Sequence, residues 1–240
     1  MLNIDATNQL RLDQERVLLA GGAGFIGHHL ALELIEKGAK VMIADHLQIN
    51  NIVKILTDSN LDEQRRQLYT NFTLDRFKLL RNKNIKITNV DVRNMSDFNK
   101  IHDDFEPTKI VHLAAISSAV IANKTPSLAY DIQISSLRNL IELSRLKNSK
   151  VNQIVFMSSS TVYGDFEEDE VTETIRPRPR GVYANGKYMG ERMVREANSL
   201  YGIPYTIIRP SALYGIRCVS GRVSQKFVEH ALMKKPLQLE

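Results

Sequence analysis

The residues with the clearest chemical potential are a tyrosine and a lysine in the run Tyr183-Ala184-Asn185-Gly186-Lys187. A helix brings residues four apart onto one face, so a helix beginning here would place the phenol beside the ammonium. A phenol with a pKa of about 10 is a poor base at neutral pH. A neighbouring positive charge lowers that pKa, and the pair could then exchange a proton with a substrate hydroxyl.

Four hydroxyl side chains follow one another in the Ser-rich segment Ser158-Ser159-Ser160-Thr161, where a strand is expected to end. Hydroxyls at the carboxyl end of a parallel strand point into the crevice that binds ligands in open α/β sheets. A simple turn does not need four hydroxyls in a row. We therefore favour a functional role for this segment.

A glycine loop, GGAGFIG at residues 21–27, follows an apolar run directly and opens a helical pattern. Gly21 permits a tight turn, and Gly24 lets the backbone approach a pyrophosphate. Gly27 lets the helix pack close to the strand. Free N–H groups and the helix dipole then favour an anion at the start of the helix.

Asp45 ends the second predicted strand. A carboxylate there accepts hydrogen bonds from both ribose hydroxyls of NAD and repels the 2′-phosphate of NADP. The chain from Arg16 to Asp45 is therefore predicted to bind NAD.

The elements that must position these groups alternate between strands and helices. Predicted strands cover residues 16–20, 40–44, 85–90, 110–114, 154–158 and 205–209. Predicted helices cover residues 25–37, 95–105, 126–147, 185–202 and 222–234. Apolar strands that alternate with helices indicate a parallel sheet covered on both faces. The predicted fold class is α/β, a Rossmann-like doubly wound sheet with helices on both faces.

Composition limits the classes of function. The 240 residues are 43% hydrophobic and 25% charged, enough for one large domain with an ordinary core. The net charge is +5, but the basic residues are scattered among acids, so no nucleic-acid partner is expected. No apolar run approaches the roughly 20 residues that span a bilayer, and no membrane association is expected. The single cysteine, Cys218, permits no disulfide within the chain, which fits a cytoplasmic location.

Together these motifs resemble the extended short-chain dehydrogenase/reductase family, in its NAD-dependent nucleotide-sugar epimerase/dehydratase branch. The resemblance runs nearly end to end and rests on the glycine loop, Asp45, Asp91-Val92-Arg93, His112-Leu113-Ala114-Ala115, the segment Ser158–Gly164, Tyr183–Lys187 and Arg209-Pro210-Ser211-Ala212-Leu213-Tyr214-Gly215.

The resemblance implies a role for each matching residue. Catalysis would fall to Ser159, Tyr183 and Lys187, with Tyr183 as the base and Lys187 tuning it. Cofactor-binding positions would be Gly21, Gly24, Phe25, Ile26, Gly27, Asp45, Asp91, Val92, Leu113, Ala114, Ala115, Ser158, Tyr183, Lys187, Pro210 and Ser211. Substrate-binding positions would be Ser117, Ser159, Ser160 and Thr161. No metal site is implied, and helices 126–147 and 185–202 would form a homodimer interface.

The implied activity is an isomerase of carbohydrate biosynthesis, an epimerase that transiently oxidises a ring hydroxyl of a nucleotide sugar. Dehydratases of the family carry an Asp-Glu pair where this chain has Ser160 and Thr161, and its decarboxylases have Glu at the position of Thr161. Hydroxyls cannot replace a carboxylic acid/base, which argues against both reactions. Two alternatives stay open: a dehydratase or reductase of the same family, and a non-catalytic NAD-binding sensor or assembly protein.

The domain division comes from the motifs and the resemblance. Residues 1–15 are expected to be a lead-in, and residues 16–216 the NAD-binding domain. A helical insertion is predicted at about 47–84, with helices at 62–68 and 73–80. Relatives in the family continue further, so residues 217–240 are expected to be a truncated, small C-terminal substrate region.

Overall fold

The computed structural model describes residues 3–4, 10–48, 52–166, 170–219 and 222–237. Parts of the predicted lead-in, insertion and C-terminal region therefore lie outside the described residues. Two short strands in the lead-in, β1 (Asn3–Ile4) and β2 (Leu10–Arg11), pair with each other in antiparallel fashion.

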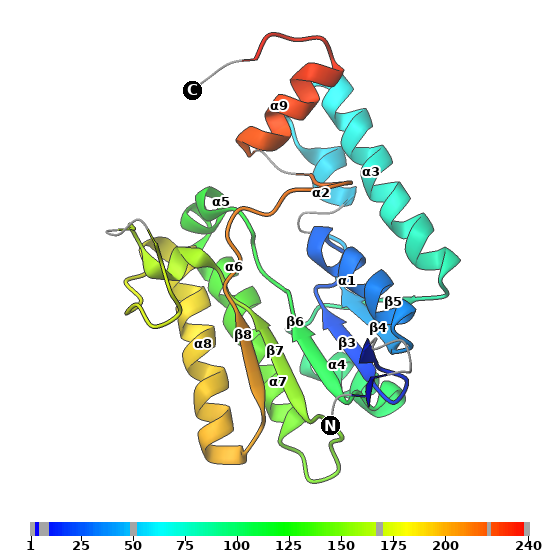
Figure 1. Cartoon of the computed structure of the whole chain (residues 1–240), viewed down its shortest axis with the longest axis vertical. Coiled ribbons are helices and arrows are strands. Elements are labelled where there is room, and N and C mark those ends of the chain that lie inside the picture. The colour runs from blue at the N-terminus through cyan, green and yellow to red at the C-terminus, as the bar shows by residue number, and fades with distance from the viewer. Residues whose placement is uncertain (1–2, 5–9, 49–51, 167–169, 220–221, 238–240) are drawn as a thin grey trace.

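Six parallel strands form the central sheet in the order β5-β4-β3-β6-β7-β8 (Figure 1). Their bounds are β3 (Arg16–Ala20), β4 (Lys40–Asp45), β5 (Lys86–Asn89), β6 (Lys109–His112), β7 (Gln153–Met157) and β8 (Tyr205–Ile208). The order reverses between β3 and β6, and such a switch point opens a ligand crevice at the carboxyl ends of the strands. The predicted doubly wound fold is confirmed, and the ends of the predicted strands differ from the observed ones by at most two residues.

Helices cover both faces of this sheet, which explains why its strands carry apolar side chains on both faces. On β3, Val17 and Leu19 pack in one cluster with Ala31 of α1 (Phe25–Glu36), whereas Leu18 and Ala20 pack in another, on the opposite face. The first face also carries α3 (Glu63–Asn82). The second carries α4 (Met95–Phe105), α7 (Ser136–Ser144) and α8 (Gly181–Tyr201).

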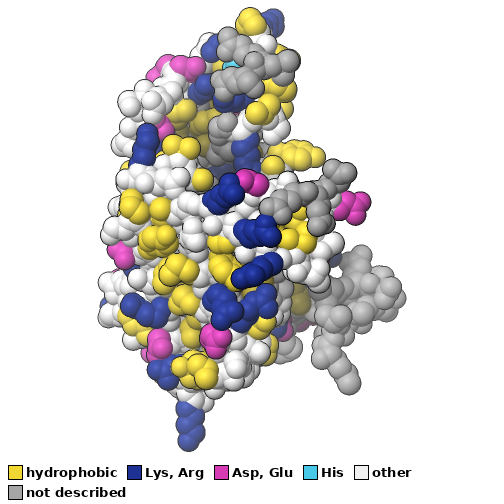
Figure 2. All heavy atoms as spheres, turned by 90° about the vertical axis from the view of Figure 1, so that its left-hand side faces the viewer, with side chains coloured by type: hydrophobic (Ala, Val, Ile, Leu, Met, Phe, Trp, Pro, Cys, Tyr) yellow, Lys and Arg dark blue, Asp and Glu magenta, His cyan; other side chains and the backbone are white. Residues whose placement is uncertain are grey.

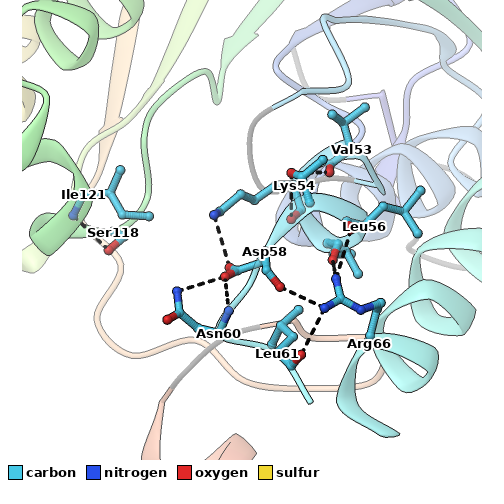
Figure 3. A network of polar contacts seen from close by, with 11 residues as sticks. Val53, Lys54, Leu56, Asp58, Asn60, Leu61, Arg66, Ser118 and Ile121 are labelled. Carbon is cyan, nitrogen blue, oxygen red and sulfur yellow. Dashed lines mark hydrogen bonds and ion pairs between the residues drawn. The ribbon is translucent and has the colours of Figure 1, made fainter. Parts of the chain in front are cut away.

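The helix predicted at residues 126–147 is present without a break from 126 to 144, but it is not α-helical throughout. It consists of α6 (Pro126–Tyr130), a π-helical turn η1 (Asp131–Ser135) and α7. The Ser136 hydroxyl donates a hydrogen bond to the Ile132 carbonyl within this turn. A further short helix, α5 (Ala119–Lys124), was not predicted. Its N-terminus is capped by Ser118, whose hydroxyl accepts from the Ile121 N–H at 3.3 Å (Figure 3).

The insertion contains α2 (Ile52–Thr57) and the single long helix α3, so the prediction of two short helices at 62–68 and 73–80 was wrong. The polar, β-branched stretch around Thr70 and Thr73 has weak helix propensity. Packing overrides it, because Tyr69, Thr73, Arg76 and Leu80 form one buried stripe along α3.

The link between α2 and α3 is fixed by the Arg66 guanidinium. It donates hydrogen bonds of 3.0–3.1 Å to the backbone carbonyls of Ile55, Leu56, Asp58 and Leu61 (Figure 3). The Asp58 carboxylate also pairs with Lys54 at 3.2 Å. These contacts turn the chain sharply and set the start of α3.

The helix α9 (Val223–Leu232) lies against α3, far from the strands it follows in sequence (Figure 1). The Tyr69 hydroxyl donates to the Glu229 carboxylate at 2.5 Å, and Arg65 pairs with the same carboxylate at 3.1 Å. The insertion thus holds the C-terminal part of the described chain. In the described ranges no helix combines the length and the apolar character that crossing a bilayer needs.

Candidate functional site

The glycine loop turns tightly between β3 and α1. Gly21 has φ +78°, and a Cβ there would lie 2.6 Å from the Ala114 backbone nitrogen. A Cβ on Gly27 would lie 2.1 Å from the Gly22 carbonyl oxygen. Gly21 therefore makes the predicted tight turn, while the close packing at Gly27 is against the loop itself rather than against the strand.

The start of α1 fits an anionic ligand. Gly24 is the N-cap residue, no side chain caps the helix there, and a Cβ on Gly24 would meet nothing within 4 Å. Phe25 and Ile26 follow as the first helical residues, half-buried. An uncapped helix start with open space beside its backbone is the environment that a pyrophosphate requires.

Asp45 lies at the end of β4, beside the glycine loop. One carboxylate oxygen accepts from the Ala23 N–H at 2.9 Å and the other from the Leu47 N–H at 2.8 Å. Burial raises the pKa of Asp45, and these two hydrogen bonds oppose the rise. The carboxylate is thus held in one orientation at the edge of the loop, with lone pairs left for ribose hydroxyls.

Ser159 and Tyr183 meet at the carboxyl end of β7. The Ser159 hydroxyl caps the short 3-10 helix η2 (Ser160–Tyr163), accepting from the Thr161 N–H at 3.2 Å and the Thr161 hydroxyl at 3.0 Å. Burial raises the pKa of Tyr183, whereas a hydrogen bond with Ser159 and the positive charge of Arg222 lower it. The predicted phenol therefore lies beside the predicted serine.

Lys187 is buried on the same face of α8. Its ammonium donates to the Met157 carbonyl at 2.7 Å and lies 5.9 Å from the centre of the Tyr183 ring. It also lies 5.4 Å from the centre of the Phe156 ring. Burial lowers the pKa of Lys187 to about 8. Ser159, Tyr183 and Lys187 are thus brought together, as their spacing and strand position predict.

Ser158 is oriented differently from its neighbour. Its hydroxyl donates to Glu191 at 2.6 Å, in the interior of the protein. The Arg209 guanidinium donates to both oxygens of the same carboxylate, at 2.8 and 2.6 Å, and to the Tyr163 hydroxyl at 2.9 Å. The hydrogen bond to Glu191 is the main reason that the pKa of Arg209 is raised. The Ser158 hydroxyl that the resemblance assigns to the cofactor is engaged in this ion-pair cluster.

His112 ends β6 and is fully buried. The Ser136 hydroxyl donates to the Ile132 carbonyl, so it must accept from His112 Nε2–H at 2.6 Å. The Nδ1 atom is then a bare acceptor, without a partner among the described residues. Burial, with the charge of Lys187, lowers the pKa of His112 to about 3. The imidazole is therefore neutral and fixed in one tautomer.

The other predicted positions lie along the same edge of the sheet. Leu113, Ala114 and Ala115 follow β6, with Ala114 against Gly21, and Ser117 is exposed beyond them. The Pro210 carbonyl accepts from the Ser160 N–H at 2.9 Å, which brings Pro210 and Ser211 beside the Ser-rich segment. Thr161 is exposed.

Asp91 lies beyond β5, at one side of an open polar groove of about 390 Å³ that Arg93, Asn94 and Arg138 also line. Its carboxylate accepts from the Arg93 guanidinium at 2.9 and 3.0 Å, which lowers the pKa of Asp91. Val92 beside it is buried. An adenine at this position would have to share Asp91 with Arg93.

Two residues near the site were not predicted. Glu191 could have been found from the sequence, because it lies one turn after Lys187 on the face of α8 that carries Tyr183. A carboxylate on a buried face needs a cationic partner, which marks the position. Arg222, at the N-cap of α9, had none, since only the fold brings its charge near Tyr183. Across the described residues, His, Cys, Asp and Glu side chains nowhere gather as three or more potential metal ligands.

Comparisons with known proteins agree with this geometry. Residues 17–239 match the model of the NAD dependent epimerase/dehydratase family. The chain is 31% identical over 203 residues to a putative UDP-glucose 4-epimerase of Methanocaldococcus jannaschii, covering 84% of this chain and 57% of that protein. It is 30% identical over 201 residues to Protein CapI of Staphylococcus aureus, covering 83% and 54%. The chain thus spans about half the length of the curated relatives it matches.

Solved structures of similar proteins also include UDP-glucose 4-epimerases, which this chain again matches over part of their length. The UDP-glucose 4-epimerase of Thermotoga maritima, solved with UDP-glucose, superposes with a TM-score of 0.73 at 26% identity, over 91% of this chain and 63% of that one. The UDP-glucose 4-epimerase of Thermus thermophilus, solved with NAD, gives 0.69 at 26% identity, over 93% and 65%.

Fold and site define a Rossmann-type protein with a glycine-rich loop before α1 and a Ser/Tyr/Lys cluster on the same edge of the sheet. The chain belongs to the NAD-dependent epimerase/dehydratase family. The prediction of NAD as cofactor is confirmed with the family. The roles of individual residues stay predictions.

Proposed function

We propose that the protein acts as an NAD-dependent nucleotide-sugar epimerase. The observation that carries the proposal is the convergence of Ser159, Tyr183 and Lys187 at the carboxyl end of β7, on the edge of the parallel sheet that also carries the glycine loop. Bound NAD supplies a hydride acceptor and returns the hydride. Tyr183 takes the proton of a ring hydroxyl, and Ser159 donates a hydrogen bond to the same oxygen.

Lys187 supports the base in two ways. Its charge lies close to the ring of Tyr183, which favours the phenolate. Its ammonium has three donors, of which the Met157 carbonyl takes one, so others are left for the nicotinamide ribose. Arg222 adds a second positive charge that lowers the pKa of Tyr183. The phenol would therefore titrate nearer neutral pH once ligands complete the site.

Epimerisation is favoured over dehydration because of the two residues after Ser159. Ser160 and Thr161 carry hydroxyls, and elimination of water from a sugar needs an acid that can protonate the leaving group. Epimerisation needs only one acid/base, which Tyr183 supplies in both directions. The names of the M. jannaschii and T. maritima relatives point to position 4 of a UDP-hexose as the reacting centre.

The test is turnover of UDP-glucose, UDP-galactose and UDP-glucuronate by NAD-loaded protein, followed by NMR of the sugar ring protons. We expect a 4-epimer from at least one of them. Tyr183→Phe should lower the rate by about 10³-fold, because it removes the acid/base. NAD binding by calorimetry should stay within about two-fold, since most of the predicted cofactor contacts, the glycine loop and Asp45 among them, are unchanged.

Full turnover in Tyr183→Phe would contradict the assignment of the base. A wild-type protein that binds NAD but neither binds nor converts any nucleotide sugar would instead support the non-catalytic NAD-binding alternative.

We also propose that the protein forms a homodimer through α8 and the helical stretch of α6, η1 and α7. These elements pack together, and their outer side carries the exposed apolar side chains of Leu128, Leu146, Met189, Leu200 and Tyr201. Figure 2 faces the side of the molecule on which α8 lies and shows hydrophobic side chains gathered there among Lys and Arg. Met189→Asp should convert a dimer to a monomer in sedimentation equilibrium; a wild-type monomer would contradict this proposal.

A further inference from the structure

The ion pair between Glu191 and Arg209 lies in the protein interior, next to the proposed catalytic residues, where Glu191 contacts Ser158. The Glu191 side chain is 1% exposed and that of Arg209 10%. The carboxylate accepts three hydrogen bonds, from the Ser158 hydroxyl and from two nitrogens of Arg209. A buried ion pair is weak evidence of stability, because desolvation offsets much of the attraction, so its placement needs another explanation.

The ion pair joins the three elements that supply the site. Ser158 follows β7, Arg209 follows β8, and Glu191 comes from the middle of α8. The backbones of the two strand ends also run side by side, since the Ser158 N–H donates to the Ile208 carbonyl at 2.8 Å. Glu191 therefore ties both strand ends to the helix that carries Tyr183 and Lys187.

The Glu191–Arg209 pair contacts the chain on both sides of Ser159: at Ser158, and at Tyr163 at the end of η2. Ser158 precedes Ser159 directly, and Met157, whose carbonyl accepts from Lys187, precedes Ser158. Tyr163, which ends the 3-10 helix capped by Ser159, accepts from Arg209. Both ends of the segment that presents the Ser159 hydroxyl are thus fixed through one carboxylate.

We propose that Glu191, paired with Arg209, is a positioning residue that sets Ser159 and the Met157 carbonyl against Tyr183 and Lys187. The proposal rests on the proposed function for the meaning of that geometry. In the described structure the hydrogen bonds of Glu191 go to Ser158 and Arg209, and it acts on the site through Ser158 and through the strand end.

The charge of Glu191 also matters to Lys187. The two residues are four apart on α8, and such residues are neighbours on a helix. The Glu191 carboxylate accepts from Arg209 and Ser158, whereas the Lys187 ammonium donates to the Met157 carbonyl. Replacing Glu191 by Gln weakens its bonds to Ser158 and Arg209, and we expect the strand end to shift relative to Lys187, which raises the pKa of the Tyr183 phenol. Loss of the negative charge alone would lower that pKa, so a rise distinguishes displacement from a simple charge effect.

The experiment compares Glu191→Gln with wild type, and Glu196→Gln serves as the matched control. Glu196 lies on the same helix in an exposed pair with Arg192. In Glu191→Gln we expect kcat to fall by about ten-fold or more, because small displacements of reacting groups are costly. The NAD dissociation constant should stay within about two-fold, and the acid limb of the pH–kcat profile should move up by about one unit. Glu196→Gln should match wild type in all three.

An unshifted pH profile would overturn the proposal, whether turnover is kept or falls only in step with thermal stability and NAD affinity. If Glu191→Gln does not fold, Ser158→Ala removes one of the three hydrogen bonds and should move the same quantities in the same direction. The ultraviolet titration of Tyr183 in the NAD complex, taken as the difference from Tyr183→Phe, needs no substrate. It should show a raised phenol pKa in Glu191→Gln, so the positioning role is testable even if no nucleotide sugar turns over.

Discussion

Lys187 illustrates the conflict between stability and chemistry at a single residue. Its ammonium is buried, with one carbonyl and two aromatic rings around it and no carboxylate partner in the described structure. Burial lowers its pKa from 10.5 to about 8, so the charged form is unfavourable in the folded state. Such an arrangement is typical of a group kept for function.

Replacing Lys187 by Met should therefore raise stability while abolishing turnover. At pH 7 the wild-type lysine is charged in both states and the desolvation penalty is fully present, so Lys187→Met should gain about 1 kcal/mol after the lost bond to Met157 is allowed for. The gain should shrink as pH rises from about 8 toward 10.5, because the folded lysine then loses its proton and the penalty with it. Urea unfolding of both proteins between pH 7 and pH 10.5 measures this difference in the free energy of unfolding.

The exposed Lys78→Met on α3 is the matched control and should stay within about 0.5 kcal/mol at every pH. A Lys187→Met protein that is less stable than wild type by more than this margin at pH 7 would contradict the argument.

At this scale the sequence predicted which residues converge but not which way each one faces. Tyr183 and Lys187 follow from helical spacing, and a functional serine follows from the strand end. The opposite orientations of Ser158 and Ser159 depend on Glu191 and Arg209, which meet only in the folded protein. A run of identical side chains carries no information about which of them faces the crevice.

At the scale of elements, α3 stands out because it reaches past the sheet to hold the chain that follows β8. The Arg76 side chain is buried on α3, and its guanidinium donates to the Arg217 carbonyl at 3.1 Å. Arg217, at φ +63°, donates in turn to His28 of α1 at 3.1 Å. The chain around Arg217 therefore lies between α3 of the insertion and α1, the helix that follows the glycine loop.

Arg76→Leu should loosen this segment. It removes the donor of the Arg217 carbonyl but also relieves the burial that lowers the pKa of Arg76 to about 10, so we expect the free energy of unfolding to change by no more than about 1 kcal/mol. Hydrogen exchange should rise at residues 215–218 and along α9, whereas the amides of β3 and β6 stay protected. The exposed Arg81→Leu, on the same helix, should leave both measurements unchanged. Equal exchange in the two variants would contradict this role of α3.

The strands of the central sheet were easier to predict than the helices. Buried parallel strands are short, uniformly apolar and bounded by turns, so each was found within two residues. Both the length of α3 and the π turn before Ser136 coincide with tertiary contacts: the buried stripe of α3, and the hydrogen bond between Ser136 and His112 of β6. Local propensity does not contain that information.

For the whole molecule, two buried histidines make the fold sensitive to acid. His28 donates through Nδ1 to the Gly24 carbonyl and accepts from Arg217 at Nε2, which fits only the neutral ring. Burial lowers the pKa of His28, like that of His112, to about 3. Their stabilising effect is complete above the unfolded pKa of about 6.5 and is lost as pH falls toward 3.

His112→Gln should reduce the steepness of this loss. A glutamine amide can still donate to Ser136, but it takes up no proton in the unfolded state. Between pH 6 and pH 4 the slope of unfolding free energy against pH should fall by up to about 1.4 kcal/mol per unit relative to wild type. Identical slopes would show that His112 is protonated in the folded protein or not buried as described.

In the proposed reaction Tyr183 and Lys187 would serve a bound NAD, which would accept a hydride from a sugar carbon and return it to the same molecule. The direct test is NMR of whichever of UDP-glucose, UDP-galactose and UDP-glucuronate the protein converts, carrying deuterium at C4 and incubated with NAD-loaded protein in ordinary water. We predict a 4-epimer that retains the deuterium at C4, with no build-up of free NADH. A 4-epimer that has exchanged its label with solvent, or release of one NADH for each sugar consumed, would contradict the account.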